Sequence, residues 1–253
     1  MHYRRNLFFV TVLILSATSG HAQDDASPIS LADKDKPFLL NYPKLDDPDG
    51  RVVLTNEHVV LQRLYVPGGA WEGIHSHPGN QIYVHIKGGE WSGRLGGEVE
   101  YWGIPSPDGE VGWMDHIPLE AGHESGNTGD SPIDLIYVTL KSNTPIAPNT
   151  DHTPQEFPNL DLELVLENDR MIVQRAILEP GKWTGAHEHP GNQVFVSIKD
   201  GLRSERRHGE TYGTAITLEP GSVGWIDALD SGETHDVGNT GDSAMEIVLV
   251  TIK

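Results

Sequence analysis

The stretch GAWEGIHSHPGNQ at residues 69–81 returns as GKWTGAHEHPGNQ at residues 181–193. Each copy contains two histidines two residues apart, then a Pro-Gly turn, then a glutamine four residues after the second histidine. Side chains two apart on a strand point to the same face, so both imidazoles of one copy can reach a single ion. The repeat therefore predicts the same small site twice in the chain.

The repeat continues at a fixed offset of 112 residues without a gap. VGWMD at residues 111–115 matches VGWID at residues 223–227, and HESGNTGDS at 123–131 matches HDVGNTGDS at 235–243. Chance does not produce such agreement over this length, whereas duplication of one domain does. Two copies are too few for a solenoid, so each copy is expected to be a closed domain.

Both copies show short apolar segments separated by Gly, Pro and Asn. Residues 59–66 and 171–178 are mixed apolar strands, residues 133–140 and 245–252 are apolar closing strands, and residues 81–87 alternate between apolar and polar side chains. No apolar stripe with a helical period is long enough to predict a substantial helix. Short strands with regular turn signals predict an all-β fold with a small sandwich or barrel in each copy.

The repeat also divides the 253-residue chain into segments. We expect a signal peptide at residues 1–22, an N-terminal arm at 23–50, a first barrel at 51–141, a linker at 142–160 and a second barrel at 161–253. The linker is expected because that segment carries four prolines among several Ser, Thr and Asn residues.

The N-terminus has the order of regions found in a secretory signal peptide. Arg4 and Arg5 give a positive start, residues 7–15 are apolar but too short to span a membrane, and small residues precede an expected cleavage site before Gln23. Export to the periplasm or out of the cell is therefore predicted. The chain has no cysteine, so stability must come from core packing, to which a bound metal can add, and not from disulfides.

The charge balance restricts the partners. The chain carries 18 Lys and Arg residues against 37 Asp and Glu residues, a formal net charge of −19 at pH 7. Such a surface repels nucleic acid and anionic lipid. Neither nucleic acid nor, after signal cleavage, a membrane is an expected partner. A small-molecule substrate is expected, and a homo-oligomer stays open.

Six of the 13 histidines occupy matched positions in the two copies, and a glutamine accompanies each set. A lone histidine is usually a surface residue, whereas matched sets in two diverged copies indicate metal ligands. Imidazoles suit transition metals, and an amide oxygen is a weak neutral ligand. We expect two divalent ions per chain (Mn, Fe, Ni or Zn). The predicted ligands are His75, His77, Gln81 and His123 in the first copy, and His187, His189, Gln193 and His235 in the second.

On these residues the chain resembles the bicupins, proteins with two tandem cupin domains. The first cupin motif is G-x5-H-x-H-x3-E-x6-G, and glutamine stands in the Glu place of both copies. The matching residues are Gly69, His75, His77 and Gly88 in the first copy, and Gly181, His187 and His189 in the second, where Asp200 replaces the final Gly.

The second cupin motif, G-x5-P-x-G-x2-H-x3-N, is also kept with its spacing, and each copy departs from it once. The first copy has Gly112, Pro118, His123 and Asn127, with Glu120 for the middle Gly. The second has Gly224, Gly232, His235 and Asn239, with Asp230 for Pro. The resemblance implies two double-stranded β-helix (jelly-roll) barrels, each with a metal site, and it is less specific for the activity.

The glutamines influence the chemistry that we expect. A three-His, one-Gln shell leaves the full charge of the ion to be met by solvent or substrate, which strengthens its Lewis acidity. This favours lyase or isomerase chemistry by proton transfer on a small organic acid or sugar-derived carbonyl compound. The shell is similar to that of cupin hydroxynitrile lyases and of some cupins that process unsaturated uronates. The missing Glu argues against reactions like those of oxalate decarboxylase or germin.

Two alternatives stay open. Cupin dioxygenases also work with three neutral histidines, so oxygen chemistry is one of them. The other is a non-catalytic protein of the cell envelope that binds metal or a small ligand.

The arginines Arg63 and Arg175 are also repeat-matched, as are their neighbours Gln62 and Gln174. One member of each neighbouring pair should point into its barrel, where an arginine could hold a substrate carboxylate. The alternative is a surface arginine in a salt bridge. Arg63 and Arg175 are therefore the candidate catalytic residues.

Overall fold

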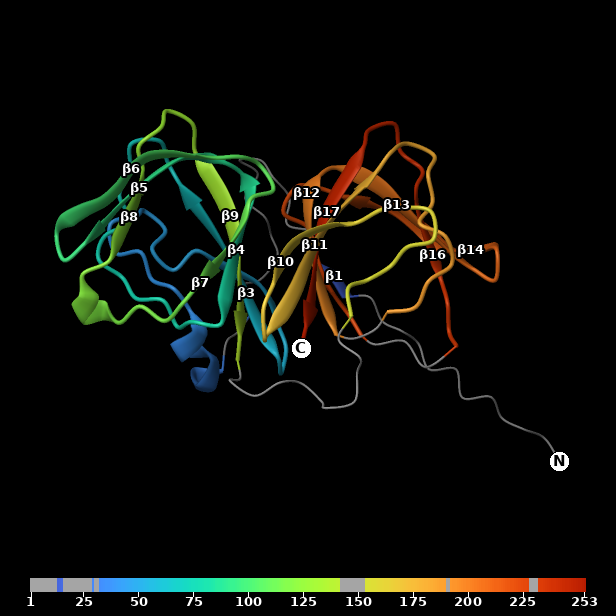
Figure 1. Cartoon of the computed structure of the whole chain (residues 1–253), viewed down its shortest axis with the longest axis horizontal. Coiled ribbons are helices and arrows are strands. Elements are labelled where there is room, and N and C mark those ends of the chain that lie inside the picture. The colour runs from blue at the N-terminus through green and yellow to red at the C-terminus, as the bar shows by residue number, and fades with distance from the viewer. Residues whose placement is uncertain (1–12, 16–28, 30–31, 142–152, 190–191, 228–231) are drawn as a thin grey trace.

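The computed structural model describes residues 13–15, 29, 32–141, 153–189, 192–227 and 232–253. Over these residues the chain forms two β-barrels side by side, the first in blue to green and the second in yellow to red (Figure 1). The only helices in these ranges are two short 3-10 turns, η1 (Asp33–Phe38) and η2 (Leu119–Ala121). None of them is long and apolar enough to cross a membrane. The all-β prediction is confirmed.

The first barrel has two antiparallel sheets. A five-stranded sheet has the order β2-β3-β9-β4-β7, and a three-stranded sheet has the order β6-β5-β8. The strands are β2 (Arg51–Thr55), β3 (Val59–Val66), β4 (Gln81–Lys87), β5 (Gly89–Leu95), β6 (Glu98–Ser106), β7 (Val111–Met114), β8 (Glu124–Asn127) and β9 (Ile133–Leu140).

The second barrel repeats this plan with sheet orders β1-β15-β12-β17-β11-β10 and β14-β13-β16. Its added strand, β1 (Leu13–Leu15), pairs with β15 and lies within the predicted signal peptide, the rest of which is outside the described residues. The other strands are β10 (Glu163–Glu167), β11 (Met171–Leu178), β12 (Gln193–Lys199), β13 (Gly201–Arg207), β14 (Glu210–Leu218), β15 (Val223–Ile226), β16 (Asp236–Asn239) and β17 (Met245–Ile252).

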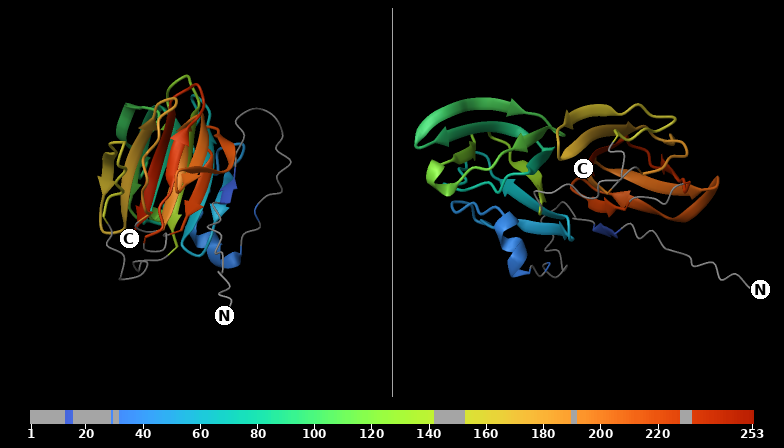
Figure 2. Two further views of the ribbon diagram at one scale, coloured as in Figure 1. Left: turned by 90° about the vertical axis from the view of Figure 1, so that its right-hand side faces the viewer. Right: turned by 60° about the horizontal axis from the view of Figure 1, so that its bottom comes forward.

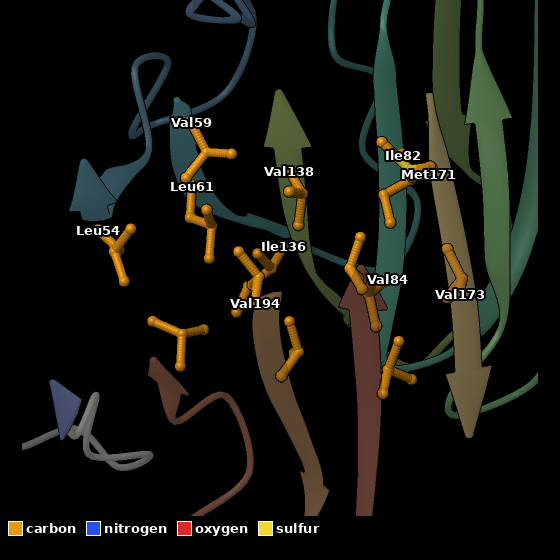
Figure 3. Close-up of a cluster of buried hydrophobic side chains, with 14 of the residues drawn as sticks. Leu54, Val59, Leu61, Ile82, Val84, Ile136, Val138, Met171, Val173 and Val194 are labelled. Carbon is orange, nitrogen blue, oxygen red and sulfur yellow. The ribbon is translucent and has the colours of Figure 1, made fainter. Parts of the chain in front are cut away.

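The two large sheets pack against each other through one apolar core to which both barrels contribute (Figure 3). Strand β4 contacts its own repeat counterpart β12, and the flanking contacts are crosswise, β2 with β15 and β7 with β10. Contacts between equivalent elements are the mark of a local twofold relation between the barrels. The right-hand view of Figure 2 shows the two barrels adjacent along this boundary.

The alternation of apolar and polar residues along β4 gives its two faces different roles. Its apolar side chains Ile82 and Val84 belong to the core between the barrels, whereas Tyr83 and His85 line a cavity of the first barrel. Successive residues of a strand face opposite sides. The alternation of residues 81–87 therefore separates a face that joins the barrels from a face that builds a site.

A short segment closes each barrel, and we call residues 40–45 and 155–160 the two latch segments. Gln62 accepts a hydrogen bond from the backbone N–H of Leu40 (2.9 Å) and donates to the carbonyl oxygen of the same residue (2.8 Å). Gln174 makes the same pair of bonds with Gln155 (2.7 and 3.0 Å). The first latch segment belongs to the predicted arm and the second to the predicted linker, whose residues 142–152 lie outside the described ranges.

Candidate metal centres

The first histidine cluster lies inside the first barrel. His75 and His77 come just before β4, and His123 comes just before β8, on the opposite sheet. All three are buried, and one ring nitrogen of each lies within 4.8 Å of the others. The Nε2 atoms of His75 and His77 are 3.0 Å apart. The structure thus brings together three histidines that the sequence separates by almost fifty positions.

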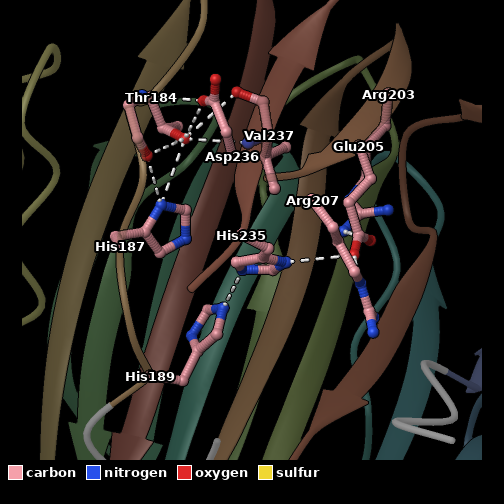
Figure 4. Close-up of polar contacts among 10 residues, drawn as sticks. Thr184, His187, His189, Arg203, Glu205, Arg207, His235, Asp236 and Val237 are labelled. Carbon is pink, nitrogen blue, oxygen red and sulfur yellow. Dashed lines mark hydrogen bonds and ion pairs between the residues drawn. The ribbon is translucent and has the colours of Figure 1, made fainter. Parts of the chain in front are cut away.

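The second barrel repeats this cluster with His187, His189 and His235 (Figure 4). The Nε2 atoms of His189 and His235 are 2.7 Å apart. Nε2 of His187 is buried and has no hydrogen-bond partner. A buried ring nitrogen without a partner needs an explanation, and a metal ligand is one.

The tautomers fit a cation at both centres. Nδ1 of His75 donates to the carbonyl oxygen of Gly73, and Nδ1 of His187 donates to that of Gly185, both at 2.8 Å. The Nε2 atoms are therefore left with lone pairs that face the cluster. Burial lowers the pKa of His75 and His187 to about 4, so both rings are neutral at pH 7.

The second histidine of each triad, His77 or His189, is also neutral at pH 7. Burial lowers the pKa of His77 and His189 to about 3. Ring nitrogens that lie this close together with lone pairs facing one another repel unless a cation lies between them. Such a donor set suits Mn, Fe, Ni or Zn.

The glutamines lie behind the histidines. Oε1 of Gln81 accepts a hydrogen bond from Nδ1 of His77 (3.0 Å), and its amide group donates to Thr139 (2.7 Å). Gln193 makes the equivalent bonds to His189 and Thr251. In this arrangement each glutamine orients a histidine, a partnership that tunes ligand basicity. Their role as direct fourth ligands stays a prediction.

Replacing Gln81 with alanine is expected to weaken metal binding in the first barrel by about 10- to 100-fold, because His77 loses the partner that fixes its tautomer. Gln81→Glu keeps the shape and adds an anion, so it should hold a divalent ion more tightly. Competition with a chelator measures both effects, and Gln193→Ala is the matched variant that should affect only the second barrel. Unchanged affinity in both Gln81 variants would exclude a role for this glutamine.

The surroundings of the two clusters differ more than the clusters do. Tyr42 packs on the ring of His75 with centroids 4.5 Å apart, and its hydroxyl group is 2.8 Å from that of Tyr137. Burial and the nearby Glu72 raise the pKa of both tyrosines well above the usual value. At the equivalent places the second barrel has smaller or less polar side chains, namely Phe157 for Tyr42, Leu249 for Tyr137 and Thr184 for Glu72.

The cavities differ accordingly. The first barrel holds a cavity of about 630 Å³ whose wall is rich in groups that accept or donate protons. The second holds one of about 50 Å³, lined mainly by apolar side chains together with its three histidines and Arg203. The residues that line the first cavity include His77, His123, Tyr83, Tyr101, Glu100 and Glu110.

One wall of the first cavity carries a polar chain that the sequence did not reveal. Nε1 of Trp91 donates to Nε2 of His85 (3.1 Å), so the ring proton is on Nδ1, which faces Ser106. Ser106 in turn donates to Glu110. Burial lowers the pKa of His85 to about 4, so this histidine is neutral at pH 7. We interpret the hydrogen-bonded series from Trp91 to Glu110 as support for the cavity wall. No repeat signal marks it, because the second barrel has Ser197 at the position of His85.

The second centre has a carboxylate behind one histidine instead. Glu205 lies 3.3 Å from Nδ1 of His235 and is also paired with Arg203 and Arg207 (Figure 4). Burial alone would raise the pKa of Glu205, but the hydrogen bonds from His235 and Arg207 and the charge of Arg203 lower it to about 2. A charged carboxylate therefore orients His235.

Arg63 and Arg175 lie at the boundary between the barrels, and their role as catalytic residues stays a prediction. Arg63 donates to both oxygens of Asp134 (2.9 and 2.6 Å), and a Cβ built on Gly221 of the second barrel would lie 2.6 Å from its guanidinium group. Arg175 reaches across in the opposite direction and donates to the carbonyl oxygen of Gly109. Successive residues of a strand face opposite sides, so the neighbouring glutamines point into the barrels and the arginines point toward the boundary between them. Contacts across this boundary explain why both arginines are repeat-matched.

Comparisons with known proteins agree on the fold. No protein-family model and no curated protein matches the chain. Among solved structures, a mutant of salicylate 1,2-dioxygenase from Pseudoaminobacter salicylatoxidans is 14% identical and covers 82% of this chain and 75% of its own, with a TM-score of 0.52. AerE from Microcystis aeruginosa is 11% identical and covers 86% of this chain and 99% of its own, with a TM-score of 0.50.

A cupin 2 conserved barrel domain protein from Leptotrichia buccalis is 11% identical and covers 80% of this chain and 87% of its own, with a TM-score of 0.45. Identities this low concern the fold and not the activity. The expected fold, two tandem cupin barrels, is confirmed, and each barrel carries a buried histidine triad.

Proposed function

We propose that the chain is a metal-dependent bicupin whose first barrel acts on a small organic acid or sugar-derived carbonyl compound by proton transfer, as a lyase or isomerase does. The observation that carries this proposal is the cavity of about 630 Å³, which places two triad histidines and several acids and phenols around one space. Its volume lies in the range of small-molecule sites.

A divalent metal held by His75, His77 and His123 would supply Lewis acidity toward a substrate oxygen. Glu100 lines the same cavity as His123 and is exposed to solvent, so its carboxylate is the group that we assign to accept the proton. Tyr137 closes the cavity beside His77, with ring centroids 5.9 Å apart. Burial keeps its hydroxyl group protonated, so it can donate a hydrogen bond to the substrate.

The second centre is proposed to be structural. A space of about 50 Å³ is far below the roughly 300 Å³ at which small-molecule sites begin. Its wall is apolar, and Glu205, the acid near its histidines, is already engaged by two arginines. A metal there would tie β16 to the segment before β12 and so add to the stability of a chain without disulfides.

A dioxygenase is the second candidate. It is favoured by the position of Gln81, which is bound to His77 and leaves three neutral histidines facing one another. One of the similar folds belongs to a salicylate 1,2-dioxygenase. The acids of the first cavity give proton transfer the stronger support.

The two candidates are separated by one experiment. The protein is loaded with Mn, Fe, Ni or Zn in turn and incubated in D₂O with a panel of hydroxy acids, keto acids and uronates. Proton transfer is expected to place deuterium next to the substrate carbonyl without uptake of oxygen, and Glu100→Gln should reduce the exchange by about 100-fold or more. Oxygen uptake without exchange would establish the dioxygenase instead. A lack of both reactions in every metal form would favour a binding protein.

We also propose that the chain is exported and works in the periplasm or outside the cell. The support is the order of regions in the first 22 residues, a positive start, a short apolar stretch and small residues before the expected cleavage site.

A further inference from the structure

One turn of the first barrel carries polar groups into the larger cavity. Strand β6 ends at Ser106 and β7 begins at Val111, and residues 107–110 form the turn between them. Ser106 and Glu110 stand at the two ends of this turn, and both line the cavity of about 630 Å³. The hydroxyl group of Ser106 donates a hydrogen bond to the carboxylate of Glu110. The place of this carboxylate in the cavity wall therefore depends on where the turn is held.

The turn is bonded on one side to its own barrel. The N–H of Gly109 donates to the carbonyl oxygen of His85 on β4 (2.8 Å), and the N–H of His85 donates to the carbonyl oxygen of Glu110 (2.9 Å). The N–H of Glu110 closes the turn by donating to the carbonyl oxygen of Pro107 (3.2 Å). The carbonyl oxygen of Gly109 takes no part in these bonds.

That oxygen is bound by the second barrel. Arg175 of β11 donates from Nη2 to the carbonyl oxygen of Gly109. This oxygen belongs to the same planar peptide group as the N–H of Glu110, so Arg175 holds the plane from which Glu110 extends. The contact is close, because a Cβ built on Gly109 would lie 3.2 Å from Nη2. A hydrogen bond from an ionised donor is about twice as strong as one between neutral groups.

The acids around Arg175 leave Nη2 available for this bond. Its Nε is 3.6 Å from Glu246, and its Nη1 is 3.4 Å from Glu163. Glu246 is buried and is also paired with Lys199 (2.6 Å). Loss of the Arg175 guanidinium therefore does not leave this buried acid unpaired, which makes Arg175 a suitable residue to substitute.

The equivalent turn of the second barrel has the same backbone but no acid. The N–H of Gly221 donates to Ser197, and the N–H of Ser197 donates to Ser222, both at 2.8 Å. Ser222 stands where the first barrel has its cavity acid. Arg63 lies against Gly221, but it donates to both oxygens of Asp134 (2.9 and 2.6 Å). The matched contact thus supports a carboxylate in only one of the two barrels.

We propose that Arg175 is a positioning residue for the cavity of the first barrel. Through the carbonyl oxygen of Gly109, the second barrel fixes the turn that places the Glu110 carboxylate in the cavity wall. The first cavity is then complete only when the second barrel is packed against it. This inference goes beyond the proposed function and needs no bound metal. Its consequence for catalysis, weaker substrate binding when Arg175 is lost, rests on the proposed function.

The first test measures amide hydrogen exchange in the full, ¹⁵N-labelled chain by NMR spectroscopy. Arg175→Ala is expected to speed the exchange of the Gly109 and Glu110 amides by about 10- to 100-fold, because the turn loses a hydrogen bond from a charged donor. Arg63→Ala is the matched control. It removes the counterpart arginine from the same boundary and should leave both amides as protected as before.

The second test observes the cavity wall itself. Nε1–H of Trp91 donates to His85, which a serine hydroxyl group connects to Glu110, so the indole signal of Trp91 responds to a displaced carboxylate. Arg175→Ala is expected to shift this signal, and Glu110→Gln should shift it too, since it removes the charge at the end of the series. Arg63→Ala should leave it in place.

Each outcome decides the question. Unchanged amide exchange and an unchanged indole signal in Arg175→Ala would overturn the inference, as would equal changes in Arg63→Ala. If Arg175→Ala does not fold, as circular dichroism would show, Arg175→Met keeps a long side chain without a donor and is judged by the same two measurements.

A third measurement concerns catalysis. With a substrate found in the deuterium-exchange assay, Arg175→Ala should raise KM and keep kcat nearly unchanged, and an unchanged KM would overturn the role toward the substrate. If the assay shows no reaction in any metal form while both NMR changes are seen, the proposed function fails and the positioning of the turn by Arg175 stands.

Discussion

His77→Ala is expected to bind one metal ion per chain instead of two and to lose turnover, whereas His189→Ala also binds one ion but keeps turnover. Each substitution removes one of three imidazoles from a single buried cluster, and the two clusters lie in separate barrels. Loss of the metal removes several kcal/mol of transition-state stabilisation. That corresponds to a loss of at least about 1,000-fold in kcat/KM for His77→Ala.

Elemental analysis and a turnover assay on the same preparations measure this difference. His116→Ala is the matched control for metal content, because its imidazole lines the first cavity but does not belong to either triad, so it should keep both ions. Equal loss of turnover in His77→Ala and His189→Ala would contradict the division of labour between the barrels. Retention of two ions by either variant would contradict the assignment of that histidine.

The two histidine triads could be predicted from the sequence, because residues that share one small site must keep a fixed spacing along the strand. His75 and His77 are two apart on an extended segment, and His123 recurs at the same offset in the second copy as His235. The two copies can be compared with each other, and positions under the same structural or functional constraint keep the same residue in both. The same reasoning gave the strands, whose bounds agree with the structure for β3, β9, β11 and β17.

The same comparison does not decide the role of the arginines. Arg63 and Arg175 are matched because the barrels face each other about a local twofold relation, so any residue that joins them occurs twice. A repeat shows that a position is constrained, but it does not show whether the constraint comes from a site or from an interface. Strand parity alone does not decide this either, because both faces of the large sheets are buried.

Two features were missed for definite reasons. The latch segments LNYPKL and QEFPNL are similar, but their offset is 115 residues, three more than that of the barrels, so a gapless comparison passes over them. Glu72 was missed because the second copy has Thr184 there, and a search for matched residues discards a position at which the copies differ. After a duplication, function is expected to diverge at such unmatched positions near matched ligands.

The shared core leads to the prediction with the largest effect on stability. Val84 is fully buried on β4, the strand that contacts β12 across the barrel boundary. Val84→Asp would place an unpaired carboxylate in an apolar core, at a cost of about 3–5 kcal/mol. Since a typical domain has only about 5–15 kcal/mol of stability, the substitution is expected to remove a large share of it and to lower the urea midpoint strongly. Tyr65→Asp is the control, because that β3 side chain is 55% exposed and should cost little.

Urea unfolding followed by tryptophan fluorescence provides the measurement. The local twofold relation between the barrels also supplies a matched second variant. Val196 is the counterpart of Val84 on β12 and is equally buried in the same core, so Val196→Asp should destabilise the chain by a similar amount. Because each barrel covers an apolar face of the other, the unaltered chain is expected to unfold in one transition. If Val84→Asp instead gave two transitions, with the second barrel as stable as before, the barrels would be independent domains. The apolar alternation of β4 and β12 would then have to be explained by something other than their mutual packing.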